Sequence, residues 1–239
     1  FRMISEKHAS LAHRQALKLS EGTGLLMGAA SPELGLGCKL VAISPGNPAR
    51  GLPGSVGLVL LLDEQSGEPL ALIEGAQLTA LRTAALNGCA IDLLCRKDAG
   101  TALLVGCGTQ AAAQAEAMAV VRDLQELRVL GREPSRASAF VADLRECLPV
   151  ELRVVEESGT ALAGVDLVTA VTNSLTPVLP GALIPDGCHV SGIGSYRPDM
   201  QEFDPVLIER SEIFVESRET ALAEAGELMA AADNGLCSP

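Results

Sequence analysis

Between residues 98 and 216, short, mainly apolar runs without alternation are separated by longer segments whose apolar residues recur at helical spacing. The runs predict strands, and the segments between them predict helices. Unalternated apolar strands are buried on both faces, and the helices that join them cover those faces. The pattern therefore predicts an α/β protein with a doubly wound parallel sheet. We expect strands over 102–105, 127–130, 152–155, 166–171, 189–193 and 213–215, and helices over 110–122, 135–147 and 160–163.

The N-terminal part of the chain follows a different pattern. Residues 1–37 show no clear period, and residues 39–43 predict a short strand. Pro and Gly crowd residues 44–57, which predicts a mobile loop or lid without regular structure. Apolar runs at 58–62 and 70–73 flank a polar turn and predict a hairpin.

Helical spacing of apolar residues begins near Thr79 and continues to residue 94. Thr79 is a plausible N-cap, because its hydroxyl can accept a hydrogen bond from an amide of the first turn. Arg82 and Thr83 would then lie in that first turn. We place a domain boundary near Asp98, where the alternation of strands and helices begins.

The composition limits the classes of function. The chain has 239 residues, 48% of them hydrophobic and 20% charged, so it can build a core and is not disordered, collagenous or a coiled coil. Aromatic residues make up only 2%, too few for stacking single-stranded nucleic acid. The net charge of −12 argues against nucleic acid as a partner, although a local cluster of bases can still bind a small anion.

The cysteines and histidines point to neither disulfides nor a metal. The cysteine count is odd, no C-x-x-C occurs, and we expect reduced thiols used as small apolar side chains. His8, His13 and His189 lack metal-ligand spacing. No signal peptide or run of membrane-span length is visible, so we predict a cytoplasmic protein without a membrane partner. The cysteines are Cys38, Cys89, Cys95, Cys107, Cys147, Cys188 and Cys237.

Residues 106–111, with the sequence GCGTQA, match the pattern G-x-G-x-x-A. They directly follow an apolar strand and directly precede an Ala-rich helix, the context that makes this pattern informative. Gly106 permits a tight turn, Gly108 lets the backbone approach a pyrophosphate, and Ala111 allows close packing of helix on strand. The start of the helix offers free N–H groups to the anion. We therefore predict dinucleotide binding in preference to an ordinary glycine turn.

The residues after the second strand bear on which dinucleotide binds. NAD sites place a carboxylate at the strand tip, and here Gly131 holds that position. Arg132, Ser135 and Arg136 follow, and guanidinium groups suit the 2′-phosphate of NADPH. NADPH is favoured over NADH. Glu133 keeps NADH open, since a shift of two residues would let it bind the ribose.

The chain resembles the ornithine cyclodeaminase/mu-crystallin family from about Arg14 to about Val215. The pairing of T-x-x-R-T-A-A with the glycine pattern at this spacing is much more specific than the glycine pattern alone. The motifs are LGCK at 36–39, PGN at 45–47 through GLP at 51–53, LTALRTAA at 78–85, GCGTQA at 106–111, and IGSYRPD at 193–199 with Glu202.

The resemblance implies a two-part molecule. A Rossmann-like dinucleotide-binding domain would span residues 98–216. A smaller α+β domain for substrate binding and dimerisation would combine residues 1–97 with the tail at 217–239, and the partner would be a second copy of the chain in a homodimer. Arg14, Lys39 and Arg82 would bind the substrate carboxylate. From the residues alone, each of these bases is more often a solvated charge.

One departure from the family pattern affects the reaction. The ornithine cyclodeaminases carry an Asp that acts on the amine at the position of Tyr196. A phenol cannot readily replace a carboxylate base at neutral pH, which argues against cyclisation with loss of ammonia. What remains is hydride transfer from NADPH to a C=N carbon, as in the ketimine reductases of this family, which the chain resembles more. Their substrates are cyclic imino acids such as Δ1-pyrroline-2-carboxylate and Δ1-piperideine-2-carboxylate.

The expected site follows from this resemblance. Lys39, Arg82 and Tyr196 would be the catalytic residues, with protonation of the imine from solvent, Lys39 or Tyr196. The rival functions are an ornithine or lysine cyclodeaminase, an amino-acid dehydrogenase on an open-chain imine, and a non-enzymatic NADPH-binding protein. The expected cofactor-binding residues are Thr83, Gly106, Gly108, Thr109, Gln110, Ala111, Arg132, Ser135, Arg136, Thr172, Asn173, Gly192 and Gly194.

Overall fold

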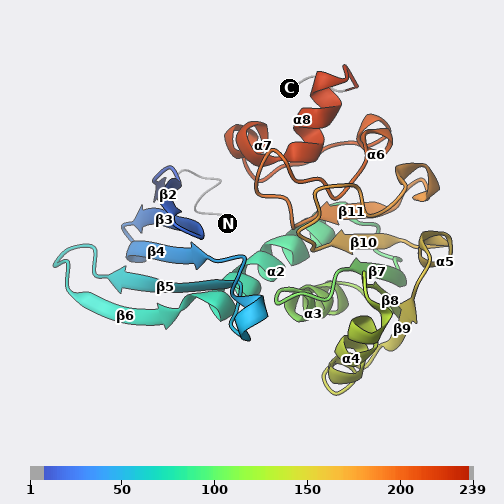
Figure 1. Ribbon diagram of the computed structural model, residues 1–239, viewed down its shortest axis with the longest axis horizontal. Coiled ribbons are helices and arrows are strands. Elements are labelled where there is room, and N and C mark those ends of the chain that lie inside the picture. The colour runs from blue at the N-terminus through green and yellow to red at the C-terminus, as the bar shows by residue number, and fades with distance from the viewer. Residues whose placement is uncertain (1–7, 237–239) are drawn as a thin grey trace. The chain divides into compact units, whose positions relative to one another are not determined.

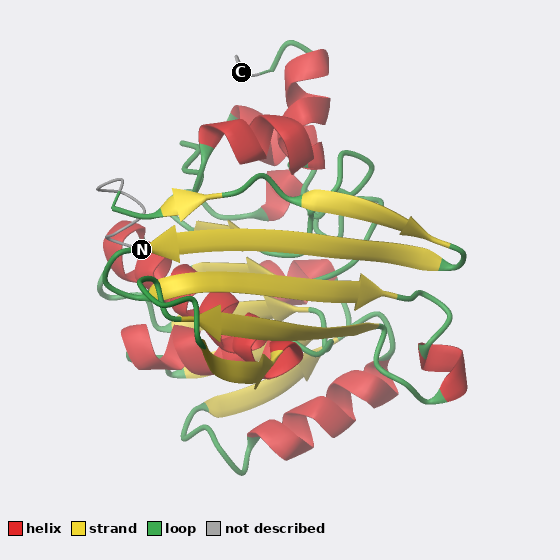
Figure 2. Cartoon of the chain, turned by 90° about the vertical axis from the view of Figure 1, so that its left-hand side faces the viewer, coloured by secondary structure: helices red, strands yellow, loops and turns green. Residues whose placement is uncertain are grey.

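The computed structural model describes residues 8–236, and the chain divides into two compact units, one up to Arg82 and one from Thr83. The first unit contains an antiparallel sheet in the order β1-β3-β4-β5-β6, with β2 also paired to β3 (Figure 2). Its strands are β1 Ser10–Leu11, β2 Gln15–Leu19, β3 Gly22–Ser31, β4 Gly35–Ile43, β5 Ser55–Leu62 and β6 Pro69–Glu74.

Much of the segment 1–37, in which the sequence showed no period, is therefore strand. The reason lies in its composition: β3 has the sequence GTGLLMGAAS, and Gly and Ala give a weak apolar alternation. The segment 44–57, predicted to lack regular structure, contains the short helix η1 Pro48–Arg50, and β5 begins inside it. The amide of Ser44 donates to the carbonyl of Gly54 at 2.8 Å and closes the base of this loop. The predicted hairpin is confirmed as β5 and β6.

One face of the antiparallel sheet is apolar and exposed. Strand pairing aligns Leu40 with Leu58 and Leu60 with Leu72, so alternate residues of neighbouring strands share this face. Leu40 is 53% exposed and Leu72 is 67% exposed. An apolar surface of this extent is unusual for a monomer and is typical of an interaction surface. We call it the apolar face; its exposed large residues are Leu17, Leu19, Leu36, Leu40, Val56, Leu58 and Leu72.

The helix α2 runs from Gly75 to Leu94 and begins earlier than predicted. Its first amides are capped by Glu74, whose carboxylate accepts hydrogen bonds from the amides of Ala76 and Gln77, both at 2.8 Å. The prediction of Thr79 as N-cap is therefore wrong, and Arg82 and Thr83 lie beyond the first turn. At the other end, the buried guanidinium of Arg122 donates to the carbonyls of Ile91 and Cys95, both at 2.6 Å.

The second unit contains a five-stranded parallel sheet in the order β11-β10-β7-β8-β9 (Figure 1). This order and the helices on both faces confirm the predicted doubly wound, Rossmann-like sheet. The strands are β7 Thr101–Val105, β8 Glu126–Leu130, β9 Glu151–Val155, β10 Leu167–Ala170 and β11 His189–Gly192. The helices are α3 Ala111–Val121, α4 Pro134–Leu144, α5 Ser158–Leu162, η2 Gly181–Leu183, α6 Pro205–Glu209, α7 Arg218–Glu224 and α8 Gly226–Asp233.

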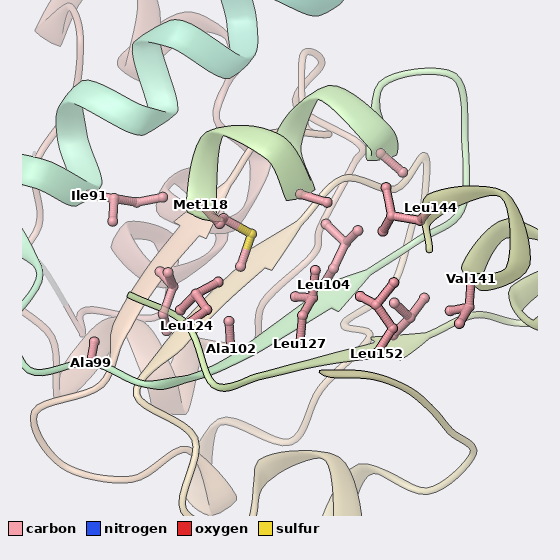
Figure 3. Close-up of a cluster of buried hydrophobic side chains, with 14 of the residues drawn as sticks. Ile91, Ala99, Ala102, Leu104, Met118, Leu124, Leu127, Val141, Leu144 and Leu152 are labelled. Atoms are coloured by element: carbon pink, nitrogen blue, oxygen red, sulfur yellow. The ribbon is translucent and has the colours of Figure 1, made fainter. Parts of the chain in front are cut away.

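Apolar side chains pack on both faces of this sheet. On one face, Leu104 and Leu127 pack with Ile91 of α2 and Met118 of α3, all fully buried (Figure 3). On the other, Leu103 and its neighbours pack with residues of α5 and α6. Burying each such side chain contributes about 1.5–3 kcal/mol, which explains the apolar character of the central strands β7 and β10.

The predicted strand at 213–215 is wrong. Ile213, Phe214 and Val215 are all exposed and lie in no strand. An apolar run forms a strand only where another strand offers it hydrogen bonds, and in the sheet of the second unit β11 stays the edge.

The last helix, α8, packs against α6 of the second unit. The assignment of the substrate domain to residues 1–97, and the return of the tail 217–239 to it, stay predictions. Residues 237–239 of that tail, Cys237 among them, lie outside the described residues.

Candidate nucleotide and anion sites

The order of the parallel sheet reverses between β7 and β10, because the strands after β7 first extend to one side and then to the other. Ligands of doubly wound proteins bind at the carboxyl ends of the strands beside such a switch point. Here the glycine loop follows β7, and Thr172 and Asn173 follow β10. The structure thus brings two predicted groups of cofactor-binding residues to one edge.

Gly106 is the residue at which the loop depends on glycine. Its φ is 107°, in the left-handed region that side chains disfavour. A Cβ added there would lie 2.7 Å from the carbonyl oxygen of Val171 and 3.2 Å from Cγ2 of Thr172. The backbone of the loop therefore passes directly against the segment after β10, as the sequence predicted for a tight turn.

Gly108 differs from Gly106, because a Cβ added to it would meet no atom within 4 Å. It is exposed, and the helix α3 starts three residues later with the fully buried Ala111. Oε1 of Gln110, directly before α3, is buried without a hydrogen-bond partner, and so is Oγ1 of Thr83 in α2. The open glycine, the close helix packing and the unpartnered oxygens all fit a bound dinucleotide.

The tip of β8 carries the residues predicted to select the cofactor. A Cβ at Gly131 would lie 3.0 Å from Sγ of Cys107 and 3.1 Å from Cβ of Ala137, so this position has little room for a carboxylate side chain. Arg132, Ser135 and Arg136 are exposed around it. Burial raises the pKa of the Cys107 thiol while the charge of Arg136 opposes that shift, which places Arg136 beside the glycine loop.

The ends of β10 and β11 are held together closely. A Cβ added to Gly194 would overlap the carbonyl oxygen of Thr172, so no larger residue fits there. Gly192 ends β11, and Tyr196 follows two residues after Gly194. The guanidinium carbon of Arg197 lies 5.5 Å from the centre of the Tyr196 ring, which is half-buried.

The three predicted carboxylate-binding residues come together in the first unit. Lys39 lies on β4 on the face opposite the apolar face, and its ammonium donates to Oγ1 of Thr79 in α2. The pKa of Lys39 is lowered by burial and then by the positive charges of Arg82 and Arg14. Arg14 precedes β2 and Arg82 lies in α2. The three residues form a cation cluster whose members act on one another electrostatically.

Three polar residues near these sites were given no such role by sequence reasoning. Thr79 was interpreted as a cap, although its spacing from Lys39 gives no signal of their contact. Glu202 stood in a family motif without a role, and Glu227 was not singled out because it lies among the acidic residues of the C-terminal helices. Only the tertiary structure identifies the partners of these carboxylates.

Within residues 8–236, no group of three or more His, Cys, Asp and Glu side chains has the placement needed to bind a metal ion. The cysteines in this range are free thiols. None of the described helices has both the length and the apolar character needed to traverse a bilayer.

The parallel sheet with its glycine loop defines a dinucleotide-binding protein, and the cation cluster accompanies it in the same chain. A family model described as the ornithine cyclodeaminase/mu-crystallin family matches residues 3–237. The chain belongs to this family, as its motifs predicted.

Several relatives are similar to the chain over most of its length. A Delta(1)-pyrroline-2-carboxylate reductase from Bacillus cereus is 37% identical over 90% of this chain, and the match covers 67% of that relative. The structure of the Thermococcus litoralis Delta(1)-pyrroline-2-carboxylate reductase in complex with NADH and L-proline has a TM-score of 0.93, 30% identity, and coverage of 98% of this chain and 74% of its own. An archaeal alanine dehydrogenase dimer with bound NAD has a TM-score of 0.91, 29% identity, and coverage of 99% and 72%.

Proposed function

We propose that this protein is an NAD(P)H-dependent reductase of cyclic imino acids, which converts Δ1-pyrroline-2-carboxylate or Δ1-piperideine-2-carboxylate to L-proline or L-pipecolate. The observation that carries the proposal is the cluster of Lys39, Arg82 and Arg14, which lies in a chain that also carries the glycine loop of a dinucleotide site. The two kinds of site match the two reactants, an anionic imino acid and a dinucleotide. The reductases among the relatives support the same reaction.

Lys39, Arg82 and Arg14 act by holding the substrate carboxylate. Arg82 supplies a forked pair of N–H donors, while Lys39 supplies a compact charge that Thr79 keeps in place. Binding an anion among these cations relieves their mutual repulsion, so the cluster is suited to an anionic ligand. Fixing the carboxylate orients the ring carbon that accepts hydride, and orientation supplies much of the rate of a two-reactant step.

The cofactor supplies the hydride when it is bound. Residues 106–111 would hold its pyrophosphate with backbone N–H groups, and we assign Thr83, Thr109 and Gln110 to the same site. Thr172, Asn173, Gly192 and Gly194 line the side on which the nicotinamide is bound. We propose a preference for NADPH, because Arg132, Ser135 and Arg136 surround a strand tip at which Gly131 leaves no carboxylate for a 2′-hydroxyl.

The proton for the imine nitrogen is proposed to come from solvent, from Lys39 or from Tyr196. The phenol of Tyr196 stands where the ornithine cyclodeaminases carry an Asp, and a phenol can donate a proton but is a poor base at neutral pH. This difference disfavours the rival lyase reaction. The similarity to an alanine dehydrogenase favours a second candidate, reduction of an open-chain imine by the same residues.

Two further proposals concern the oligomeric state of the protein and its cellular compartment. A homodimer would cover the apolar face of the first unit, since a second copy offers the same apolar surface about a two-fold axis. The cytoplasm is the proposed compartment, because free thiols persist where the medium is reducing.

A substrate screen tests the function. Oxidation of NADPH and of NADH, followed by absorbance, is measured with both cyclic imines, with pyruvate plus ammonia, and without an acceptor. The proposal expects turnover with at least one cyclic imine. Ammonia release from ornithine or lysine would instead support the lyase, turnover only with pyruvate and ammonia would support the dehydrogenase, and tight NADPH binding without turnover would support a binding protein.

A further inference from the structure

Glu202 is a fully buried carboxylate whose two oxygens bind two different loops. Oε1 accepts a hydrogen bond from the amide of Thr172 at 2.6 Å, and Oε2 accepts one from the amide of Gly194 at 2.7 Å. Thr172 follows β10 and Gly194 follows β11. One side chain thus ties together the carboxyl ends of two neighbouring strands at the edge where ligands of this fold bind.

Glu227 extends this arrangement from α8. Its Oε1 accepts a hydrogen bond from the hydroxyl of Ser195 at 3.2 Å, while its Oε2 is buried without a partner. The start of α8 is fixed close by, since a Cβ on Gly226 would overlap the carbonyl of Met200. Burial raises the pKa of Glu202, the hydrogen bonds from Gly194 and Thr172 oppose that shift, and the charge of Glu227 adds a smaller effect in the raising direction.

We propose that Glu202 and Glu227 are positioning residues that set the loops holding the nicotinamide ring. This inference rests on the proposed function. It assigns a role to two buried acids whose burial is otherwise unexplained. Burying a carboxylate is unfavourable unless its hydrogen bonds are made, and both oxygens of Glu202 accept one. The two oxygens of Glu202 fix the spacing of the amides of Thr172 and Gly194. Glu227 holds the residue after Gly194, because it accepts the hydrogen bond from the Ser195 hydroxyl.

The chain offers a matched control in Asp204. Its carboxylate also joins two backbone amides, with Oδ2 accepting from Gly181 at 2.9 Å and Oδ1 from Leu207 at 3.0 Å. These amides belong to η2 and α6, not to the loops after β10 and β11. Asp204→Asn therefore also removes a carboxylate that joins two backbone amides, but it leaves the proposed nicotinamide loops unchanged.

The test compares NADH with ADP-ribose, which lacks only the nicotinamide ring of the dinucleotide. Titration calorimetry on the full-length protein gives both Kd values for wild type, Glu202→Gln and Asp204→Asn. In Glu202→Gln one amide faces an N–H donor in place of an acceptor, so the loops shift. We expect NADH affinity to fall about tenfold while ADP-ribose affinity changes less than about twofold. Asp204→Asn should leave the ratio of the two Kd values as in wild type.

If Glu202→Gln weakened the binding of NADH and of ADP-ribose equally, or left the ratio of their Kd values unchanged, the proposal would be overturned. Glu202 would then have a purely structural role. Should Glu202→Gln not fold, Ser195→Ala supplies the same test through Glu227, with Ser138→Ala as its control because that hydroxyl donates to the carbonyl of Pro134 in α4. A shifted ratio in Ser195→Ala alone supports the role of Glu227, and an unshifted ratio refutes it. Failure of the wild type to bind NADH, NADPH and ADP-ribose alike would instead refute the proposed function.

Discussion

The ammonium of Lys39 donates a hydrogen bond to the hydroxyl of Thr79, which in turn donates to the carbonyl of Gly75 in the same helix. This contact joins the middle of β4 to the helix that carries Arg82. It leaves the ammonium with two further N–H donors for a ligand. Lys39 is also half-buried and close to two guanidinium groups, so its charge is easier to remove than that of an exposed lysine.

The pH dependence of substrate capture should reflect this lowered pKa. Lys39 is protonated below its pKa and binds a carboxylate there, and it loses its charge as the pH rises through that value. We expect kcat/KM for the imino acid to fall on the alkaline side at a pH below the usual range of lysine. Lys39→Arg should move this limb to higher pH, because a guanidinium stays protonated.

Steady-state rates from pH 6 to 11 measure this effect, with Lys18→Arg as the control, since Lys18 is an exposed lysine on β2 of the same unit. An alkaline limb that stays in place in Lys39→Arg would exclude Lys39 as its origin.

Loss of Arg82 should weaken substrate binding and not cofactor binding. Removing a charge-assisted hydrogen bond costs about 1.5–3 kcal/mol, which corresponds to roughly 10- to 100-fold in kcat/KM for Arg82→Ala, mainly through KM. The Kd for NADH, measured by fluorescence, should stay at the wild-type value. Arg50→Ala serves as control, because Arg50 is exposed and pairs with Glu21 at 3.1 Å. Normal turnover in Arg82→Ala would remove Arg82 from the site.

Gly108→Ala should impair cofactor binding without loss of stability. A Cβ at this position meets no protein atom within 4 Å, so the melting temperature should stay within about 1–2 °C of wild type. The same methyl group would occupy the space through which the backbone approaches a pyrophosphate, and we expect NADH affinity to fall about tenfold or more. Gly159→Ala, at an equally open glycine in α5, should change neither quantity. Wild-type NADH affinity in Gly108→Ala would contradict the placement of the pyrophosphate.

The choice between the two cofactors should depend on Arg132 and Arg136. If their guanidinium groups bind a 2′-phosphate, Arg132→Ala and Arg136→Ala should each raise the KM for NADPH roughly tenfold and leave the KM for NADH nearly unchanged. Arg153→Ala is a suitable control, since that exposed arginine on β9 pairs with Glu126. Equal effects on both cofactors would argue that the arginines bind no 2′-phosphate.

The apolar face predicts a change of oligomeric state. Leu58→Glu places a charge in the middle of that face and should convert a dimer to monomer, because an unpaired charge cannot be buried in an interface at low cost. Analytical ultracentrifugation measures the mass of each form. Leu93→Glu, at an exposed residue of α2 in the other unit, should leave the mass as in wild type. A wild-type protein that sediments as a monomer would refute the homodimer.

The parallel sheet and the glycine loop could be predicted because their signals are local. The central strands β7 and β10 are buried on both faces and read as apolar runs, and Gly106 lies between strand and helix in the chain itself. The antiparallel sheet was largely missed before β4, because strands built from Gly and Ala have little apolar contrast. The family motifs, rather than any local period, pointed to Lys39, Arg82 and Arg14.

The sequence by itself determined the α/β class, the turn at Gly106 and the residue types available for binding an anion. Only the tertiary structure decided that Thr79 holds Lys39 instead of capping a helix, and that Glu202 joins the loops after β10 and β11. Both contacts pair residues from elements that are not adjacent along the chain. Their energies depend on distance and burial, which a sequence pattern does not encode, whereas apolar periodicity and glycine turns are properties of the chain's own neighbouring residues.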